Sequence, residues 1–307
     1  MLPIFLKTLP FFALIGLGWW AGRIRFFPEI ATEYLTRFVF FFALSAMLFR
    51  FSAELSLASI FDPTFAAAYL VGCVAIYALV FAVALLRRAT LAEAAIEAQC
   101  GIIGNTGFLG VPLMIALIGP AAAGPMLMVL TIDLIVFSSL ITLIITASKE
   151  GALGWGIFKR LGMGLVRNPM IVSMGAGIAW SATGWPLPGP AVDFLTLLGA
   201  AATPAALFAI GASLASRAAE RVSVALWLSF AKLVLHPAAV AFAALILFPV
   251  ERQAAGVMVA AASLPVAGNV YMLARHFGVA PQRVSASILI STAFSILTVT
   301  LVIGWMT

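Results

Sequence analysis

Ten long apolar segments alternate with short charged stretches, and this alternation constrains the fold more than any other feature. The segments cover about residues 2–22, 34–53, 64–86, 92–118, 125–147, 169–184, 189–215, 223–249, 253–277 and 283–306. Each is close to the ~20 residues that a helix needs to cross the hydrocarbon core of a bilayer. Because 64% of the 307 residues are hydrophobic and only 9% are charged, a soluble globular domain is excluded. The sequence predicts an all-α membrane protein with ten transmembrane helices in the lipid bilayer.

The positions of the basic residues predict the orientation of the chain. If the N-terminus is outside, thirteen of the seventeen Lys and Arg residues fall in or beside cytoplasmic loops. The remaining four are Lys7, Arg50 and Arg252 toward the outer side, and Lys232 inside the eighth segment. We therefore expect both termini to lie outside a plasma (bacterial inner) membrane. The net charge of +6 then reflects orientation and gives little reason to expect nucleic acid as a partner.

The longest polar interval divides the chain into two sets of five segments. It runs from Ser148 to Asn168 and carries several basic residues. The expected organisation is a first five-helix repeat at 1–147, a cytoplasmic linker at 148–168 and a second five-helix repeat at 169–307. Because five crossings are an odd number, the second repeat must enter the membrane from the opposite face. The two repeats are thus predicted to be inverted relative to one another.

Two Gly-Asn pairs indicate where the helices are interrupted. The chain has three asparagines, and two of them stand in Gly104-Asn105 and Gly268-Asn269, in the fourth and ninth segments. Pro112 follows the first pair and Pro265 precedes the second, so the prolines do not match between the halves. Unwound backbone inside a membrane is tolerated where it lines a cavity. Paired interruptions in two halves therefore point to a transporter's binding site.

At these residues the chain resembles the auxin efflux carrier family, which includes the plant PIN-type carriers and many bacterial members. The matching pieces are Gly104 through Leu113, Arg167-Asn168-Pro169, Lys232 with Pro237, and Leu264-Pro265 through Asn269. Their order extends over essentially the whole chain. The long cytoplasmic loop common in the plant carriers has no counterpart in this sequence.

The resemblance implies a fold and a function. The fold is that of the bile-acid/sodium symporters and sodium/proton antiporters, with a scaffold subdomain and a transport subdomain whose broken helices 4 and 9 cross at the substrate site. The scaffold includes the second and seventh helices and is the expected interface of a homodimer. The bacterial substrates are small carboxylates such as malate or malonate, and an auxin-like acid is the related alternative.

The interrupted helices suggest how such an anion would be bound. The half-helix after each break presents free N–H groups and the positive end of its dipole, which suit a carboxylate. The candidate substrate-binding residues are Asn105, Thr106, Gly107, Pro112, Pro265, Gly268 and Asn269. The alternative is that the two pairs are packing kinks in which an asparagine caps a half-helix.

Three ionisable residues inside segments are candidates for coupling or charge compensation. Lys232 could neutralise the anion or replace a bound sodium ion, or it could lie at the membrane interface. His236, one turn further, could form a protonatable stripe with it or be a packed, carbonyl-bonded residue. Asp133 could couple transport to protons, pair with Lys232, or remain protonated against the backbone. Coupling to H⁺ or Na⁺ is thus expected to be possible, without any cofactor.

Other polar residues are expected to be structural. Glu93 and Glu97 should form an interfacial cluster with Arg87 and Arg88. Cys73 and Cys100 lie in apolar segments and are expected to pack without binding a metal.

The sequence gives little support for an enzyme, because it contains no histidine, serine or carboxylate arrangement suited to catalysis. A channel would need a ring of like side chains from an oligomer. We therefore expect a secondary active transporter of a small organic anion that works by alternating access at the crossing of helices 4 and 9. The alternatives are a cation/proton (sodium) antiporter, which would need more acidic residues at the crossing, and a non-transporting membrane receptor.

Overall fold

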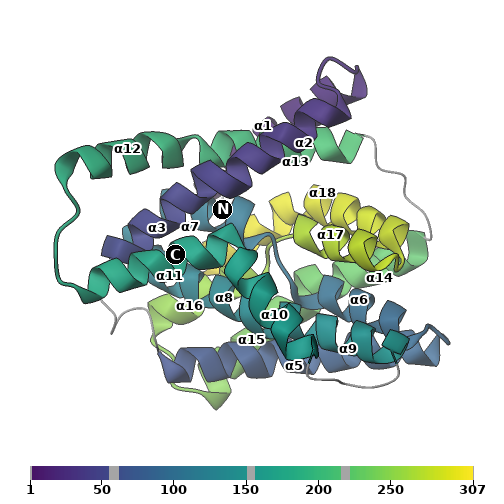
Figure 1. Ribbon diagram of the computed structural model, residues 1–307. Helices are drawn as coiled ribbons and strands as arrows, with labels where there is room; N and C mark the ends of the chain where they lie inside the picture. Colours follow the sequence, from purple (N-terminus) through teal and green to yellow (C-terminus); the bar gives the residue numbers. More distant parts are fainter. Residues whose placement is uncertain (1, 55–61, 151–155, 216–221, 307) are drawn as a thin grey trace.

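The computed structural model describes residues 2–54, 62–150, 156–215 and 222–306, and in these ranges the regular secondary structure is helical (Figure 1). Six helical stretches are long and apolar enough to cross a membrane: Glu29–Glu54, Pro63–Leu86, Pro120–Ser148, Gly189–Ala215, Val222–Leu247 and Pro281–Trp305. They correspond to the second, third, fifth, seventh, eighth and tenth predicted segments. The prediction of an all-α, multi-pass membrane protein is confirmed.

The first half of the chain is built as follows. It contains α1 (Leu2–Arg23), α2 (Glu29–Phe38), η1 (Val39–Ala43), α3 (Leu44–Glu54), α5 (Pro63–Leu86), α6 (Leu91–Ile102), η2 (Thr106–Gly110), α7 (Val111–Ile118), η3 (Pro120–Ala122), α8 (Ala123–Ile132), η4 (Asp133–Phe137) and α9 (Ser138–Glu150). The fourth predicted segment is therefore two short helical pieces, α6 and η2–α7, separated by three residues.

The second half follows a similar order. It contains α10 (Gly156–Arg167), α11 (Pro169–Ala182), α12 (Gly189–Ala200), α13 (Ala202–Ala215), α14 (Val222–Phe230), η5 (Ala231–Leu235), α15 (His236–Phe242), η6 (Ala243–Leu247), α16 (Arg252–Ala262), α17 (Gly268–Phe277) and α18 (Pro281–Met306). The ninth predicted segment is likewise divided, into α16 and α17. The sixth is the short helix α11.

Polar residues at the helix starts explain where several helices begin. Asp62 accepts hydrogen bonds from the N–H groups of Thr64 and Phe65 at the start of α5, and Pro63 occupies its first turn. Asn168 caps α11 in the same way, again followed by a proline. These side chains satisfy N–H groups that have no partner within the helix.

Wide, π-helical turns interrupt several of the long helices. η2 begins at Thr106, η4 begins at Asp133, and η5 contains Lys232. Such turns are rare and change the direction in which side chains project, and they occur frequently at functional sites. Three of the polar residues singled out from the sequence thus lie where the helical geometry is irregular.

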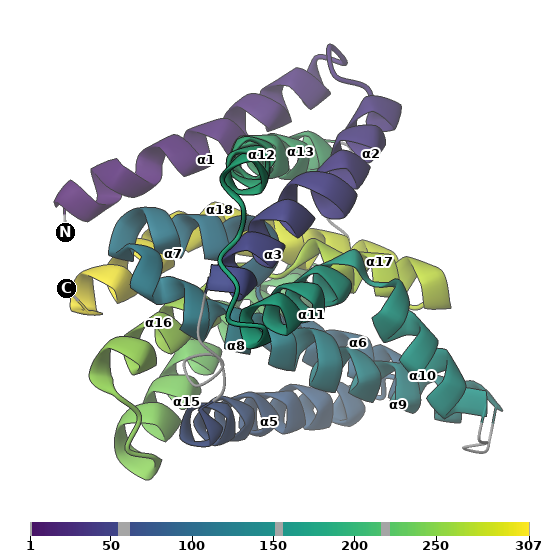
Figure 2. The same cartoon turned by 60° about the vertical axis from the view of Figure 1, so that its left-hand side comes forward.

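The helices pack as two groups. In one, α1 lies along α13 and α3 lies along α11, while α2 and α12 complete the layer. In the other, α5 contacts α6 and α15, α15 contacts α16, and α14 contacts α18. Figure 2 shows α1, α2, α12 and α13 together at the top, and α5 and α15 at the opposite side. The second group contains both broken helices.

Close approach of α1 and α13 depends on glycine. A Cβ atom on Gly18 would collide with the carbonyl group of Phe208, and a Cβ atom on Gly211 would collide with that of Ile15. Small residues are what allow helices to approach closely in a membrane, where there is little hydrophobic force between them. The close contact between α1 and α13 therefore requires glycine at these two positions.

The interval expected to be a linker contains a helix. Residues 151–155 lie outside the described residues, but α10 follows them and contacts α9 and α11. Met163 and Val166 on α10 are exposed beside the exposed Lys159 and Arg167. This mixture of apolar and basic side chains is typical of helices that lie in the membrane interface.

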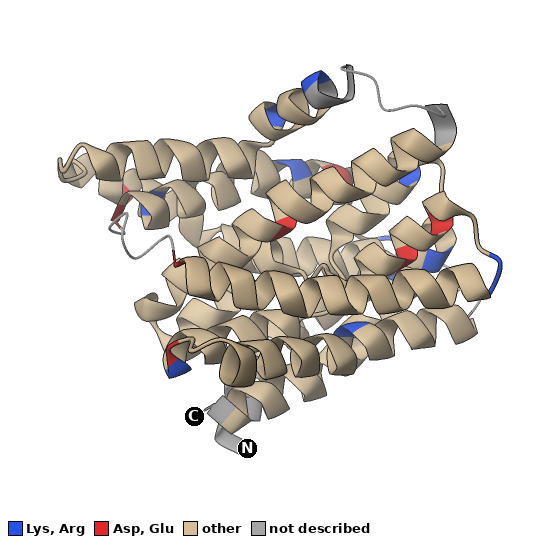
Figure 3. Ribbon diagram, turned by 90° about the horizontal axis from the view of Figure 1, so that it is seen from below, with Lys and Arg blue, Asp and Glu red and all other residues tan. Residues whose placement is uncertain are grey.

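The beginning and the end of the chain lie at the same end of the molecule. Thr8 on α1 and Thr300 on α18 are joined by a hydrogen bond of 3.2 Å. The N and C labels also lie together in Figures 2 and 3. Figure 3 shows most charged residues gathered toward the ends of the helices, with few in the middle of the bundle.

Candidate functional site

The two helix breaks lie against each other and are joined by their backbones. The N–H of Asn105 donates to the carbonyl oxygen of Pro265 at 2.8 Å, and the N–H of Ala267 donates to that of Ile103 at 3.1 Å. This is an antiparallel pair of hydrogen bonds, of the kind found between strands. Each break therefore satisfies backbone groups of the other, which is necessary where water is excluded.

Gly104 and Val266 lie opposite each other between these two hydrogen bonds. Their own backbone groups bond to other neighbours. The carbonyl oxygen of Gly104 accepts from the N–H of Thr106 at 2.7 Å. The N–H of Val266 donates to the hydroxyl oxygen of Ser291 on α18 at 3.1 Å. Nearby groups thus complete the hydrogen bonding of both breaks.

Lys232 is fully buried beside the second break. Its amino group donates to the carbonyl oxygen of Ala262, the last residue of α16, and lies 3.2 Å from Nδ1 of His236. The C-terminal end of a helix carries partial negative charge and unsatisfied carbonyls, which favour a cation. Lys232 therefore lies at the second break, and its role in transport stays a prediction.

Gly104 makes room for this lysine. A Cβ atom on Gly104 would lie 3.2 Å from the carbonyl oxygen of Ala261 and 3.3 Å from Nζ of Lys232. Both distances are tighter than ordinary van der Waals contact. The glycine is required here for close approach, and it brings the first break to within contact of the lysine.

His236 and two residues of α5 extend the polar cluster. Nε2 of His236 lies 3.2 Å from the sulfur of Cys73. One turn earlier on the same helix, Tyr69 has its ring 6.2 Å from the imidazole and donates its hydroxyl to Oδ1 of Asp133 at 3.0 Å. Cys73 is thus buried, as a packing residue would be, and its sulfur also contacts the imidazole.

Asp133 lies at the first break. Its Oδ2 atom is 3.4 Å from the hydroxyl of Thr106, which begins the second half of the broken helix, and the residue is buried. The N-terminal end of a helix favours negative charge. Among the described residues no direct ion pair joins Asp133 to Lys232. Its partners are the hydroxyls of Tyr69 and Thr106.

Two of the candidate residues lie in apolar surroundings. A Cβ atom on Gly107 would lie 2.6 Å from the terminal methyl of Met170, with Leu44 and Leu130 next nearest. Pro112 is buried in the first turn of α7. These positions are compatible with helix packing, and the role of both residues in binding stays a prediction.

The two Gly-Asn pairs do not occupy equivalent positions. Asn105 precedes the first turn of η2, whereas Gly268 and Asn269 are the first two residues of α17. The second break is longer, because five residues separate α16 from α17 and three separate α6 from η2. The two breaks therefore differ in length and in where the Gly-Asn pair stands relative to the following helix.

Gly268 and Asn269 are more accessible than the other break residues. Gly268 is exposed, and a Cβ atom there would meet nothing within 4 Å. The Oδ1 atom of Asn269 is buried and has no hydrogen-bond partner among the described residues. A buried amide oxygen without a donor is uncommon, and it suits a position that a ligand completes.

Tyr69, Cys73 and Ser291 were not identified from the sequence. Tyr69, Cys73 and Tyr77 follow each other at intervals of four residues in an otherwise apolar segment. That spacing places them on one face of a helix and could have indicated a polar stripe. Ser287, Ser291 and Ser295 repeat the same interval in the last segment, and all three are fully buried.

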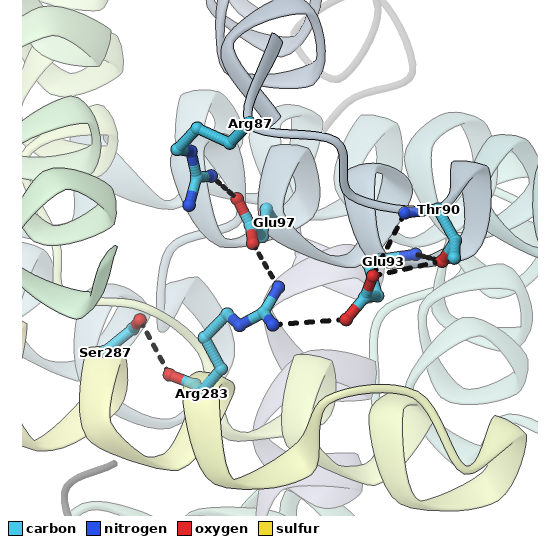
Figure 4. A network of polar contacts seen from close by, with 6 residues as sticks. All are labelled: Arg87, Thr90, Glu93, Glu97, Arg283 and Ser287. Carbon is cyan, nitrogen blue, oxygen red and sulfur yellow. Dashed lines mark hydrogen bonds and ion pairs between the residues drawn. The ribbon is translucent and has the colours of Figure 1, made fainter. Parts of the chain in front are cut away.

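A buried ion network holds the first half of the broken helix (Figure 4). The carboxylate of Glu97 is fully buried and pairs with both Arg87 and Arg283, and Arg283 also pairs with Glu93 at 3.1 Å. Glu93 and Thr90 form reciprocal caps at the start of α6. The expected cluster of Glu93 and Glu97 with Arg87 is therefore confirmed. Its second arginine is Arg283 of α18, whereas Arg88 is not part of the network.

Comparisons with known proteins agree with these features. Residues 3–303 match the family described as "Membrane transport protein". The chain is also 33% identical over 304 residues to a protein of Rhizobium meliloti (strain 1021) named "Putative malonate transporter", an alignment that covers 95% of this chain and 92% of that protein. The resemblance noted in the sequence is thereby confirmed. The chain belongs to this family of membrane transport proteins, and it is a transporter rather than an enzyme.

Proposed function

We propose that the protein carries a small organic anion across the membrane by alternating access, with a short dicarboxylate such as malonate as the first candidate. The observation that supports this most directly is the meeting of two helix breaks, with Lys232 at one and Asp133 at the other. The printed name of the Rhizobium meliloti relative supports the substrate class.

The proposal includes a fold of ten spans in two inverted repeats. In this arrangement α1 and α11 are equivalent, and so are α3 and α13. The contact of α1 with α13 then has its counterpart in the contact of α11 with α3. In each contact a helix of one half packs against a helix of the other half, as expected for two related repeats. The group of α1, α2, α3, α11, α12 and α13 would serve as the scaffold, and the group with both breaks would move against it.

The anion would bind at the exposed start of α17. The N–H groups of Gly268 and Asn269 lie in the first turn of this helix, where the dipole favours negative charge. The side-chain amide of Asn269 has an oxygen without a partner and can offer its NH₂ group to a carboxylate after rotation. Asn105 and Thr106 would complete the site from the opposite break, so the anion would lie between two half-helices.

Lys232 would act as a built-in cation. Its amino group occupies the C-terminal end of α16, which is the position where transporters with broken helices bind Na⁺. Because the amino group of Lys232 already supplies a positive charge at this helix end, no sodium ion is required there. We therefore propose sodium-independent transport, with Asp133 as the group through which protons could be coupled.

The experiment is uptake of radiolabelled malonate into proteoliposomes. Asn105→Ala and Asn269→Ala should each reduce uptake at least about tenfold, since each removes polar contacts to a desolvated anion. Gln282→Ala, which removes an exposed amide at the start of α18, is the matched control and should transport normally. Normal uptake in both asparagine variants would contradict the proposed site.

The coupling is tested in the same vesicles. Uptake by the unmodified protein should be unchanged when sodium is replaced by choline, and it should respond to an imposed pH gradient. A strict requirement for sodium would contradict the assignment of Lys232 as the resident cation.

A further inference from the structure

We propose that the chain binds the phosphate group of an anionic phospholipid in a cavity at the end of α1. The cavity has a volume of about 370 Å³ and lies between the end of α1, the start of α2 and the end of α13. Arg23, Arg25, Phe27, Pro28 and Ala212 are among its lining residues. It shares no residue with the crossing of the broken helices, so this inference does not depend on the proposed function.

The charge of the cavity suits a phosphate. Arg23 and Arg25 are exposed, and within the described part of the chain neither guanidinium lies within ion-pair distance of a carboxylate. Glu29 also lines the cavity, so two positive charges face one negative charge. Two guanidinium groups can bind the oxygens of one phosphate in a forked geometry. Basic pockets between transmembrane helices are characteristic binding places for anionic headgroups.

The backbone fixes Arg25 in the turn that ends α1. Its φ angle is 61°, in the left-handed region that glycine adopts most easily. The N–H of Arg25 donates to the carbonyl of Gly22 at 3.1 Å, which fixes this turn at the end of α1. The position thus carries an arginine where a glycine would fit with less strain.

The surroundings of the cavity favour a lipid over a free anion. Trp20, Ile24 and Phe26 are exposed at or beside the end of α1, and Phe26 is 79% exposed. The 22 residues of α1 span roughly 33 Å at 1.5 Å per residue, so its end lies at the level of the headgroups. Tryptophan is enriched at that level. A phosphate in the cavity would leave its acyl chains against these apolar side chains.

The test is native mass spectrometry of the full chain in detergent. Phosphatidylglycerol and phosphatidylcholine with the same acyl chains are added in equal amounts. The unmodified protein should retain phosphatidylglycerol preferentially, and Arg25→Gly should lower its retention about five-fold. Arg23→Gln should give a similar loss.

Arg88→Gly is the matched control. Arg88 also has a φ angle of 61° and is exposed, but it does not line the cavity. Each glycine variant loses one positive charge, and each replaces an arginine whose backbone is in the left-handed region. Arg88→Gly should retain phosphatidylglycerol as the unmodified protein does. Because glycine relieves backbone strain, Arg25→Gly should melt at an unchanged or higher temperature, so a loss of lipid would not result from unfolding.

Three results would overturn the inference. Equal losses in Arg25→Gly and Arg88→Gly would mean that the lipid responds only to net charge. Equal retention of phosphatidylcholine would exclude selection for the anionic headgroup. Complete release of phosphatidylglycerol by millimolar inorganic phosphate would identify a site for a free anion instead.

Discussion

The amino group of Lys232 donates a hydrogen bond to the carbonyl oxygen of Ala262, the residue at which the first half of a broken helix ends. A fully buried lysine would be costly in a membrane, because its charge has left water. The end of the helix compensates for part of this cost by offering a carbonyl and the negative end of its dipole. The break and the lysine thus stabilise each other.

Replacing Lys232 by methionine should therefore damage both stability and transport. Methionine has a similar length, but it removes the hydrogen bond from Lys232 to the carbonyl of Ala262, which then keeps only the contact with Nδ1 of His236 at 3.2 Å. The loss should cost about 1–3 kcal/mol. We expect a lower melting temperature and a loss of malonate uptake in proteoliposomes. Lys159→Met, at an exposed position on α10, should leave both unchanged. Full uptake by Lys232→Met would exclude a role in transport.

A methyl group at Gly104 should be harmful, although one at Gly268 should not prevent folding. The added Cβ on Gly104 would crowd both Nζ of Lys232 and the carbonyl of Ala261, whereas that on Gly268 would meet nothing within 4 Å. Crowding in a packed interior typically costs about 1–3 kcal/mol. Thermal melting of Gly104→Ala and Gly268→Ala in the same detergent checks this. Equal melting temperatures would show that the lysine can move aside freely.

Glu97→Gln should be strongly destabilising because it breaks a buried ion network. Glu97 is fully buried between Arg87 and Arg283, and removing one charge leaves two guanidinium groups without their partner. Such losses cost about 3–5 kcal/mol. Glu33→Gln breaks an exposed pair with Arg37 on α2 and should cost no more than about 1 kcal/mol. Similar unfolding midpoints for the two variants would contradict the importance of the network.

The contact between α1 and α13 can be tested with two glycines of one helix. Gly18→Ala would drive a methyl group into the carbonyl of Phe208, while Gly16→Ala would meet nothing within 4 Å. We expect Gly18→Ala to lower the melting temperature. Gly16→Ala should leave it unchanged or raise it, because alanine favours helix by about 1 kcal/mol over glycine. A reversed order would mean that α1 and α13 separate readily.

Much of the architecture could be predicted from apolar segment lengths. The lipid environment leaves helices as the main solution for spanning backbone, so long apolar runs translate directly into helices. The two interruptions could also be predicted, because Gly104 and Pro265 are unfavourable within a helix. The helix α10 was not expected, since its basic residues made the interval resemble a linker.

The details of the crossing could not be predicted. Whether Lys232 reaches the break or the interface depends on which half-helix packs beside it, and this is a property of tertiary contacts. Cys73 and Tyr69 were similarly obscured, because a single cysteine or tyrosine in an apolar run is compatible with simple packing. The difference between Asn105 and Asn269 arises from the unequal lengths of the two breaks, which the matching dipeptides do not reveal.

The reciprocal hydrogen bonds between Asn105 and Pro265 and between Ala267 and Ile103 restrict how the molecule can move. If either interrupted segment shifted alone, it would strand amide and carbonyl groups in a medium that offers no replacement for them. In the proposed alternating-access mechanism the fourth and ninth segments would consequently move as one body. The gate would then lie at the boundary of that body, where it contacts the scaffold, and the two breaks would keep their mutual arrangement.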